Sequence, residues 1–598
     1  MFSRRHRLAL SLFIVMLCNT SAWAEAIPVE LKKTDKGWQL LRDGKPYFIR
    51  GAGGSAGLQK LAAAGANSLR TWGSDDIGDL LDEAHALGLS VTVGIWLGHE
   101  RHGFDYNDEA QVKAQLESAR KAVMRYKDHP AVLLWGVGNE MEGFDSGDNP
   151  AIWKAVNDIA SMIKELDPAH PTMTITAEIG GGRISSIEKY GSAIDIHGIN
   201  AYGGSPSIPE RYRAAGATKP YILTEFGPPG EWEVAKNDWD AAYELTSTEK
   251  AQRYRESYQQ AVLGAPGVAL GSYVFIWGYK MEATATWFGM FLPDGSPLAA
   301  VDVMTELWSG HPRKNLAPAV KPLIVKGDSQ VDPGSELQVA SEIKDAEAGE
   351  VKVRWVLRRE QQGEQIGGDY RAMLPDIEDA IIESRSDGVL VRMPEEPGSY
   401  RLFLYVYDDA GNAATANVPL LVKGEARTAM PFLVYEDGFD GMPWAPSGWM
   451  GSYQELQLDG DHSDNPHRGN TCIKMRYQGK FGWVGVAWQH PSNNWGDTEG
   501  GFDVSSATAL EFWARGEWGA EHISAGVGLI GKDKPYPDSG LATIDDIVLE
   551  KEWKRYVIPL DGIDLSSIKT GFYISVKGRQ TSVTVYLDSI RFIRQSGE

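Results

Sequence analysis

The stretch LLWGVGNEMEG (Leu133–Gly143) decides the fold that we expect for the first half of the chain. Its apolar residues, interrupted only by glycine, lead directly into Asn139 and Glu140. Continuous apolar character is typical of a strand that is covered on both faces, as in a parallel sheet. A carboxylate at the end of a buried strand is costly unless it has a partner. The stretch therefore predicts a parallel strand whose last residues carry chemistry.

The same pattern recurs along the neighbouring sequence. Between Pro46 and Arg313 we expect eight apolar strands: Tyr47–Gly51, Ala66–Thr71, Ser90–Trp96, Val132–Val137, Thr172–Ala177, Ile194–Ile199, Tyr221–Thr224 and Gly271–Ile276. Amphipathic helical patterns separate them, and one of these, Thr246–Leu263, stops at Gly264. Eight strand–helix units of this total length predict a (β/α)8 barrel over residues 25–314. The competing open, doubly wound sheet would normally have fewer strands and a glycine-rich loop after the first, and the sequence has no such loop.

The rest of the chain reads as all-β. Residues 315–424 have short alternating strands and turn signals such as Pro333-Gly334, which predict an immunoglobulin-like β-sandwich acting as a spacer. Residues 432–598 also alternate with period two and are rich in tryptophan, which predicts a β jelly roll. The expected architecture is therefore multidomain: a TIM barrel, a sandwich and a jelly roll.

The first 24 residues resemble a secretory signal peptide. Arg4, Arg5 and Arg7 precede an apolar run over Leu8–Leu17, and Ala22-Trp23-Ala24 has the form of a cleavage site. The alternatives are a membrane anchor, for which the run is short, and a lipid anchor at Cys18. We expect export, to the periplasm or the medium, with no membrane anchor. Cys472 would then be the one cysteine left, without an internal disulfide.

The charge of the chain limits its partners. The formal net charge is −22, which disfavours nucleic acid and anionic lipid. A neutral polymer suits such a protein better, and the 20 tryptophans include candidates for stacking on sugar rings. The sequence has no HExxH motif and no cluster of histidines, so we expect no catalytic metal and no cofactor. It leaves the oligomeric state open.

Reactive side chains of a (β/α)8 barrel lie where its strands end. Asn139 and Glu140 end the fourth strand and Glu225 ends the seventh, so two glutamates are expected to share the barrel mouth. Such a pair suits the cleavage of a glycosidic bond, because neighbouring carboxyl groups split their pKa values and supply one acid and one base. The other residues expected near the strand ends are Arg70, Trp72, Trp96, His197, Asn200, Tyr202 and Trp277.

Together these residues resemble the barrels of glycoside hydrolase clan A. The segment DGKPYFIRGAGG (Asp43–Gly54) is similar to the start of the barrel in the β-galactosidase-like and cellulase-like families. The resemblance implies a retaining mechanism in which Glu140 is the general acid/base and Glu225 the nucleophile. It further implies the following roles: Arg70 and Tyr202 bind Glu225, Asn139 holds the substrate 2-hydroxyl, Trp277 floors the −1 subsite and His197 lines the pocket. Whether His197 or Asn200 points inward stays open, as does whether Trp232 and Trp287 stack on sugars or pack loops.

The C-terminal segment has a resemblance of its own. GWVGVAWQHPSNNWGD (Gly482–Asp497) and VYLDSIRFI (Val585–Ile593) look like galactose-binding-type carbohydrate modules, whose implied role is to tether substrate. Such modules often hold a structural calcium, for which the candidates are Glu436, Asp437, Asp440 and Asp588.

We thus expect an exported retaining β-glycoside hydrolase acting on a poly- or oligosaccharide, with β-glucan as one candidate. Two alternatives remain: a transglycosylase that uses the same two glutamates, and a non-catalytic carbohydrate-binding protein. A metal-dependent hydrolase is disfavoured, because the first strand carries no His-x-His pair.

Overall fold

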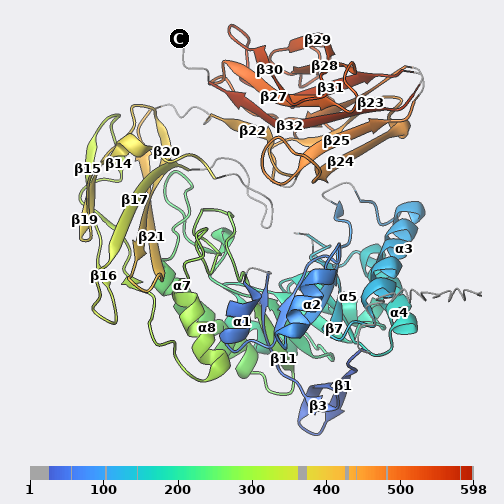
Figure 1. Cartoon of the computed structure of the whole chain (residues 1–598), viewed down its shortest axis with the longest axis vertical. Helices are drawn as coiled ribbons and strands as arrows, with labels where there is room; N and C mark the ends of the chain where they lie inside the picture. The colour runs from blue at the N-terminus through green and yellow to red at the C-terminus, as the bar shows by residue number, and fades with distance from the viewer. Residues whose placement is uncertain are drawn as a thin grey trace, which may run out of the picture.

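A computed structural model describes residues 26–54, 57–100, 104–143, 146–360, 373–424, 430–439, 441–479, 482–579 and 581–594. The predicted signal peptide and Asp440 lie outside these residues. Figure 1 shows the barrel, an antiparallel sandwich beside it and a second two-sheet unit at the C-terminal end of the chain. Among the described residues, no helix combines the length and the apolar character needed to cross a membrane.

The first part is a closed barrel of eight parallel strands, as predicted. Each strand pairs with the next, and the last pairs with the first. The strands are β4 (Ile49–Gly53), β5 (Ser68–Arg70), β6 (Ser90–Ile95), β7 (Val132–Asn139), β8 (Thr172–Ala177), β9 (Ile196–Asn200), β10 (Tyr221–Glu225) and β11 (Ala269–Val274). Two boundaries matter for the pocket: β7 continues to Asn139, and β11 ends at Val274, two residues before the predicted end.

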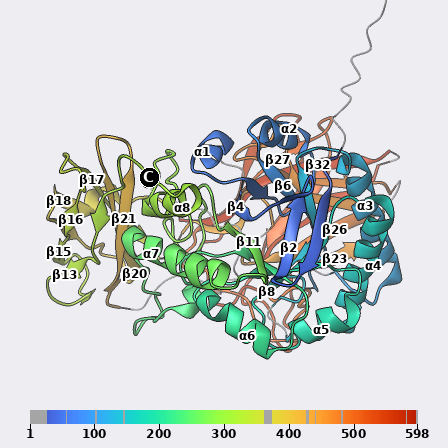
Figure 2. The same ribbon diagram turned by 90° about the horizontal axis from the view of Figure 1, so that it is seen from below.

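A ring of helices surrounds the barrel (Figure 2). They are α1 (Leu58–Ala63), α2 (Gly78–Ala86), α3 (Glu109–Tyr126), α4 (Pro150–Leu166), α5 (Arg183–Tyr190), α6 (Ile208–Ala214), α7 (Ser247–Ser257) with its π-helical continuation η4 (Tyr258–Leu263), and α8 (Ala299–Ser309). In α4, Asn149 caps the N-terminus and Pro150 occupies the first turn. Its buried Ile152, Val156 and Ile159 recur at helical spacing, so one apolar stripe fixes this helix against the sheet.

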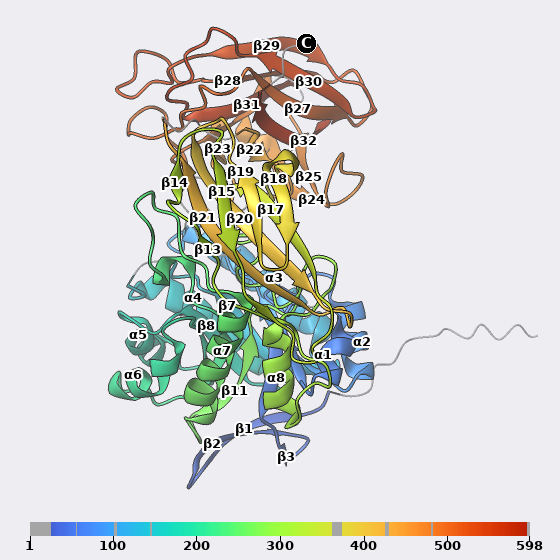
Figure 3. The same ribbon diagram turned by 90° about the vertical axis from the view of Figure 1, so that its left-hand side faces the viewer.

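A small antiparallel sheet lies at the opposite end of the barrel from the predicted site. It consists of β1 (Val29–Thr34), β2 (Gly37–Arg42) and β3 (Lys45–Pro46). The amide of Val29 donates to the carbonyl of Ala169, and Trp38 donates to Gly267, in the loops that precede β8 and β11. Figures 1 and 3 place the C-terminal two-sheet unit on the far side of the barrel from this sheet. The unit therefore lies on the side where the barrel strands end.

The sandwich packs two antiparallel sheets over an apolar core. One sheet contains β13 (Ile324–Val325), β15 (Glu336–Ala340), β19 (Gly388–Arg392) and β18 (Ile381–Arg385). The other contains β14 (Gln330–Val331), β21 (Ala413–Val422), β20 (Gly398–Tyr407) and β17 (Lys352–Arg359), and a short pair is formed by β12 (Ala319–Val320) and β16 (Ile343–Lys344). Phe403 and Tyr405 of β20 pack with Leu292 and Leu298 of the barrel, so the two domains share an apolar contact.

The C-terminal unit also has two antiparallel sheets with a common core, as expected of a jelly roll. One contains β24 (Leu456–His462), β25 (Cys472–Tyr477), β32 (Val583–Ile593), β27 (Ala509–Gly516) and β30 (Lys554–Pro559), with β22 (Phe432–Tyr435) on β32. The other contains β23 (Ala445–Gly451), β26 (Trp483–Gln489), β31 (Thr570–Lys577), β28 (His522–Val527) and β29 (Ala542–Val548). Cys472 is a buried free thiol in β25. Sugar binding by this unit stays a prediction.

Candidate active site

A sharp backbone turn brings Asn139 and Glu140 into the barrel mouth. The pairing of β7 with β8 shifts register between Val137 and Asn139, and Gly138 has φ +74°. This left-handed φ favours glycine, and a Cβ here would also displace the side chain of Met141, whose sulfur would lie 2.0 Å away. Glu140 itself has φ +52°, a left-handed conformation that costs energy for a residue other than glycine. The strained backbone at Glu140 lies where the side chains of Asn139 and Glu140 both reach the barrel mouth.

Glu225, at the end of β10, is surrounded by hydrogen-bond donors. Its Oε1 accepts from Arg70 Nη1 at 2.9 Å and from Trp72 Nε1 at 2.8 Å, and its Oε2 accepts from Tyr202 Oη at 2.7 Å. Arg70 and Glu225 are 1% and 5% exposed, so the ion pair between them is shielded from water. An ion pair and three donors stabilise a negative charge on this carboxylate and fix its orientation.

Glu140 lies in a different environment. Its Oε1 accepts one hydrogen bond, from Asn200 Nδ2 at 2.6 Å. Burial, followed by repulsion from the charge of Glu225, raises the pKa of Glu140 to about 8, although the bond from Asn200 opposes the shift. Glu140 is therefore protonated at neutral pH. The surroundings of the two glutamates thus differ as acid and nucleophile require: Glu140 has a raised pKa, and three donors, one of them the cation Arg70, surround Glu225.

A chain of amides joins the two carboxyl groups. Asn139 Oδ1 accepts from Arg70 Nη2 at 2.6 Å and from Asn200 Nδ2 at 3.1 Å. Thr224 Oγ1 donates to Asn200 Oδ1 at 2.8 Å, and the Thr224 carbonyl accepts from Arg70. Asn200 is thus the residue of β9 that points inward. Thr224 was missed by the sequence analysis, which could have found it as the polar residue next to Glu225 in an apolar strand.

The prediction for His197 is wrong. Side chains alternate between the two sides of a strand, so His197 and Asn200, three residues apart, point to opposite sides of β9. His197 Nε2 lies 2.9 Å from Thr176 Oγ1, and its ring packs against Tyr212 of α6. Burial, then the charges of Lys219 and Arg183, lowers the pKa of His197 to about 3. It is a neutral core residue between the strands and the helices.

The prediction for Trp277 is also wrong. Because β11 ends at Val274, Trp277 lies beyond the strand end, where its ring packs against Phe291 and against Trp308 of α8. Phe275, directly after the strand, contacts the rings of Trp72 and Tyr202 instead, at centroid distances of 5.9 and 5.8 Å. Phe275 is therefore the aromatic residue that packs beside the donors to Glu225.

The other tryptophans of the mouth fall into two groups. Trp96 is 49% exposed and stacks on His99 at 5.1 Å, and Trp232 is 56% exposed with its ring edge-on to Tyr202 at 5.9 Å. Both are available for stacking on sugars. Trp287 is buried and donates from Nε1 to the carbonyl of Pro229 at 2.9 Å, so it packs loops together.

A polar cavity of about 310 Å³ adjoins Tyr202. Its walls come from the loops that follow β9 and β10 and from α7, and the lining residues are Tyr202, Gly203, Pro206, Gly227, Pro229, Glu233, Arg253 and Ser257. Glu233 closes one wall by accepting hydrogen bonds from the amides of Gly203, Gly204 and Gly230. The cavity thus adjoins the site through Tyr202, which donates to Glu225 and contacts the exposed Trp232.

Within the described parts of the chain, no group of three or more His, Cys, Asp or Glu side chains converges as a metal site. Two of the residues proposed for calcium, Asp437 and Asp588, have other partners. Asp437 accepts hydrogen bonds from Asn470 and Thr471, and Asp588 accepts from the amides of His467 and Arg468. The calcium interpretation gains no support from these contacts.

Comparison with known proteins finds similarities in the barrel. Residues 75–233 match the family model "Glycosyl hydrolases family 2, TIM barrel domain". A "Putative beta-glucuronidase" of Formosa agariphila is 24% identical over 234 residues, which are 34% of this chain and 20% of that protein. A "Probable mannan endo-1,4-beta-mannosidase C" of Aspergillus terreus is 25% identical over 162 residues, 23% of this chain and 39% of that protein. The chain thus matches well under half the length of either relative. A solved structure of a β-D-glucuronidase from Dictyoglomus thermophilum aligns with a TM-score of 0.38 and 19% identity, over 48% of this chain and 54% of that one.

Proposed function

We propose that this protein, whose residues 75–233 match the glycosyl hydrolase family 2 TIM barrel domain, is a retaining β-glycoside hydrolase of poly- or oligosaccharides. One observation carries the proposal: two glutamates share a polar cluster, yet Glu225 is held by three donors while burial and Glu225 itself raise the pKa of Glu140 to about 8. Retaining glycosidases need this division between an ionised nucleophile and a protonated acid.

The reaction follows from these two states. Glu225 attacks the anomeric carbon while Glu140 gives its proton to the glycosidic oxygen, so the C–O bond to the leaving sugar breaks and an ester to Glu225 forms. Glu140, now ionised, then takes a proton from water, whose oxygen attacks the same carbon and releases Glu225. Tyr202 stays protonated throughout, because burial and then the charge of Glu225 raise its pKa well above the ordinary value. It can therefore donate to Glu225 in every state.

The neighbouring residues orient the substrate. The carbonyl oxygen of Asn139 is committed to Arg70 and Asn200, which leaves its amide group as the donor for a sugar hydroxyl. Exposed Trp96 and Trp232 supply flat apolar surfaces for further sugar rings. We assign the substrate side of the pocket to these three residues.

We propose a neutral β-linked substrate, with β-glucan as the first candidate. Three described cations at the mouth are already paired with carboxylates: Arg70 with Glu225, Lys280 with Glu282 at 2.6 Å, and Arg253 of the adjoining cavity with Glu256 at 2.9 Å. A substrate carboxylate would add to the negative charge of Glu140, Glu225 and Glu282. Neutral glycosides are therefore expected to react faster than the corresponding uronides.

The test is a panel of β-linked gluco-, manno- and galacto-oligosaccharides and β-glucuronides, with the anomer of the first product followed by NMR. We expect the β-anomer to appear first from a neutral substrate. Initial release of the α-anomer would disprove the double displacement. Cleavage of no glycoside, with unchanged sugar binding in Glu140→Gln, would support a carbohydrate-binding protein instead. Longer oligomers at high substrate concentration would identify a transglycosylase.

The pH dependence gives a second prediction. Glu140 must be protonated to act as the acid, and its pKa is raised to about 8, so kcat/KM should be independent of this group below pH 8 and fall about tenfold per unit above it. The measurement is a pH profile of kcat/KM with an unactivated oligosaccharide. In Glu140→Ala, assayed with an activated aryl glycoside, this alkaline limb should vanish. An alkaline limb that remains in the variant would assign the acid to another group.

A further inference from the structure

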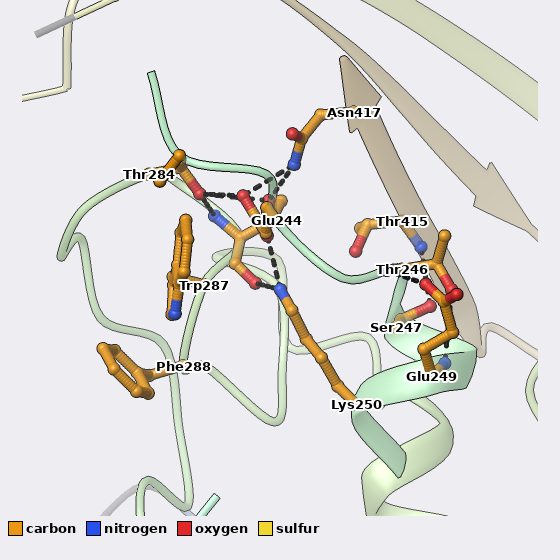
Figure 4. Close-up of polar contacts among 12 residues, drawn as sticks. Glu244, Thr246, Ser247, Glu249, Lys250, Thr284, Trp287, Phe288, Thr415 and Asn417 are labelled. Carbon is orange, nitrogen blue, oxygen red and sulfur yellow. Dashed lines mark hydrogen bonds and ion pairs between the residues drawn. The ribbon is translucent and has the colours of Figure 1, made fainter. Parts of the chain in front are cut away.

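Glu244 is a buried carboxylate that joins the barrel to the sandwich (Figure 4). It lies in the loop between β10 and α7, its side chain is 1% exposed, and it forms an ion pair with Lys250 of α7. From the barrel it accepts hydrogen bonds from Thr284 Oγ1 at 2.5 Å and Thr286 Oγ1 at 2.7 Å. From the sandwich it accepts one from Asn417 Nδ2 at 2.6 Å. Two loops of the barrel mouth and strand β21 thus meet at one carboxylate.

The sandwich also contributes to the charge of this cluster. Burial alone would raise the pKa of Glu244, but Lys250 and then Arg401 of β20 more than offset it and lower the pKa. Arg401 donates to Asn417 Oδ1 at 2.7 Å and to the carbonyl of Ala242 at 2.8 Å. Glu244 is therefore ionised, and an ionised buried group holds its partners firmly because leaving any of them unpaired is costly.

A short series of contacts connects the residues around Glu244 with Glu225, the proposed nucleophile. Thr286 is followed directly by Trp287 and Phe288, and Lys250 lies 6.0 Å from the ring centroid of Trp287. Phe288 packs against Tyr202 at a centroid distance of 5.2 Å, and Tyr202 donates to Glu225. Figure 4 shows Trp287 and Phe288 on the same loop segment as Thr284, next to Glu244. The loop after β11 thus lies between the sandwich and Tyr202.

We infer that the sandwich positions the active site: Asn417, through Glu244 and the loop that carries Phe288, holds Tyr202 in place against Glu225. The inference rests on the proposed function for its kinetic meaning. Asn417 and Glu244 touch no substrate and are positioning residues. The sandwich is then a working part of the hydrolase, in contrast to the spacer expected from the sequence.

A double-mutant cycle between the sandwich and the pocket tests this link. Asn417→Ala is expected to lower kcat about tenfold with little change in KM, because orientation of the nucleophile matters more in the transition state than in binding. In a Tyr202→Phe background, the same substitution should cost less than twofold, because the bond that it disturbs is already absent. Equal losses in both backgrounds would overturn the inference.

The matched control is Tyr400→Phe, which removes a part-buried hydrogen bond within the sandwich, from Tyr400 to the carbonyl of Glu396 at 2.7 Å. It should leave kcat within twofold at a similar loss of thermal stability. If Asn417→Ala does not fold, Thr286→Val removes a donor to Glu244 from the barrel side and should show the same coupling to Tyr202→Phe. A loss of kcat in Tyr400→Phe equal to that in Asn417→Ala would indicate general destabilisation and refute the positioning role.

Amide hydrogen exchange separates this inference from the proposed function. Peptides that cover residues 276–292 should exchange at least threefold faster in Asn417→Ala than in the wild type, and at the wild-type rate in Tyr400→Phe. This readout needs no substrate, so an inactive wild type would refute the hydrolase while leaving the link testable. Unchanged exchange in Asn417→Ala would refute the link whatever the enzyme cleaves.

Discussion

Replacement of Glu225 by alanine is expected to lower kcat/KM by at least about 10⁴-fold on every substrate, activated aryl glycosides included. The carboxylate is the only group that we assign to bond formation with the anomeric carbon, so a better leaving group cannot compensate for its loss. Its three donors, Arg70, Trp72 and Tyr202, would be left facing a cavity. The measurement is steady-state kinetics of the purified variant, with circular dichroism to confirm folding.

Azide provides the chemical control for Glu225→Ala. A small anion entering the vacated space should attack from the side where Glu225 lay and give a glycosyl azide with the anomeric configuration inverted relative to the substrate. The matched variant is Glu178→Gln, which alters another strand-end carboxylate, one that follows β8 and pairs with Arg211 at 2.7 Å. Glu178→Gln should retain activity within a few-fold. If Glu225→Ala retained a tenth of the wild-type activity, the nucleophile would have to be another residue.

The second large effect is expected for Glu140→Ala, and it should depend on the leaving group. Loss of a general acid typically costs about 10²–10⁴-fold. For an oligosaccharide the loss in kcat should fall at the upper end of this range, because an alkoxide leaves poorly without a proton. For an aryl glycoside with an acidic phenol, formation of the glycosyl-enzyme should be nearly normal. The second step should then limit turnover, since no base activates water.

Azide again distinguishes the roles. In Glu140→Ala it needs no general base, so it should accelerate turnover of the aryl glycoside and give the azide with retained configuration. The opposite configurations expected for the two variants assign acid and nucleophile independently of any rate. An azide product of inverted configuration from Glu140→Ala would mean that Glu140 is the nucleophile and Glu225 the acid. If Glu140→Ala lost the same factor in kcat on activated and unactivated substrates, Glu140 would not be the group that transfers the proton.

Both predictions depend on environments that the residue types alone do not distinguish. Glu140 and Glu225 are both glutamates at strand ends of one barrel mouth. They differ because Arg70, Trp72 and Tyr202 donate to Glu225, while Glu140 is half-buried and has a single amide donor. The raised pKa of Glu140 is therefore a property of the assembled cluster.

The sequence by itself determined the barrel and the polar ends of its strands. Apolar runs of strand length, separated by amphipathic helices, leave few other arrangements once both faces of each strand must be buried. In a parallel barrel all strands end at the same face, so Arg70, Asn139, Glu140, Tyr202 and Glu225 could be expected together from their positions alone. The chemistry of a paired acid and nucleophile followed from residue type.

Only the tertiary structure decided which side each strand-end residue faces and what holds it there. His197 and Asn200 are three residues apart on β9 and so point to opposite sides, which places Asn200 and not His197 in the pocket. Strand β11 ends two residues before its predicted end, which leaves Phe275 and not Trp277 beside the donors to Glu225. The link from Asn417 to Glu244 joins residues 173 positions apart. The local pattern of apolar residues predicts which residues are buried, but not toward which side the last side chain of a strand points. The partner of a buried charge depends on how segments far apart in the sequence pack together.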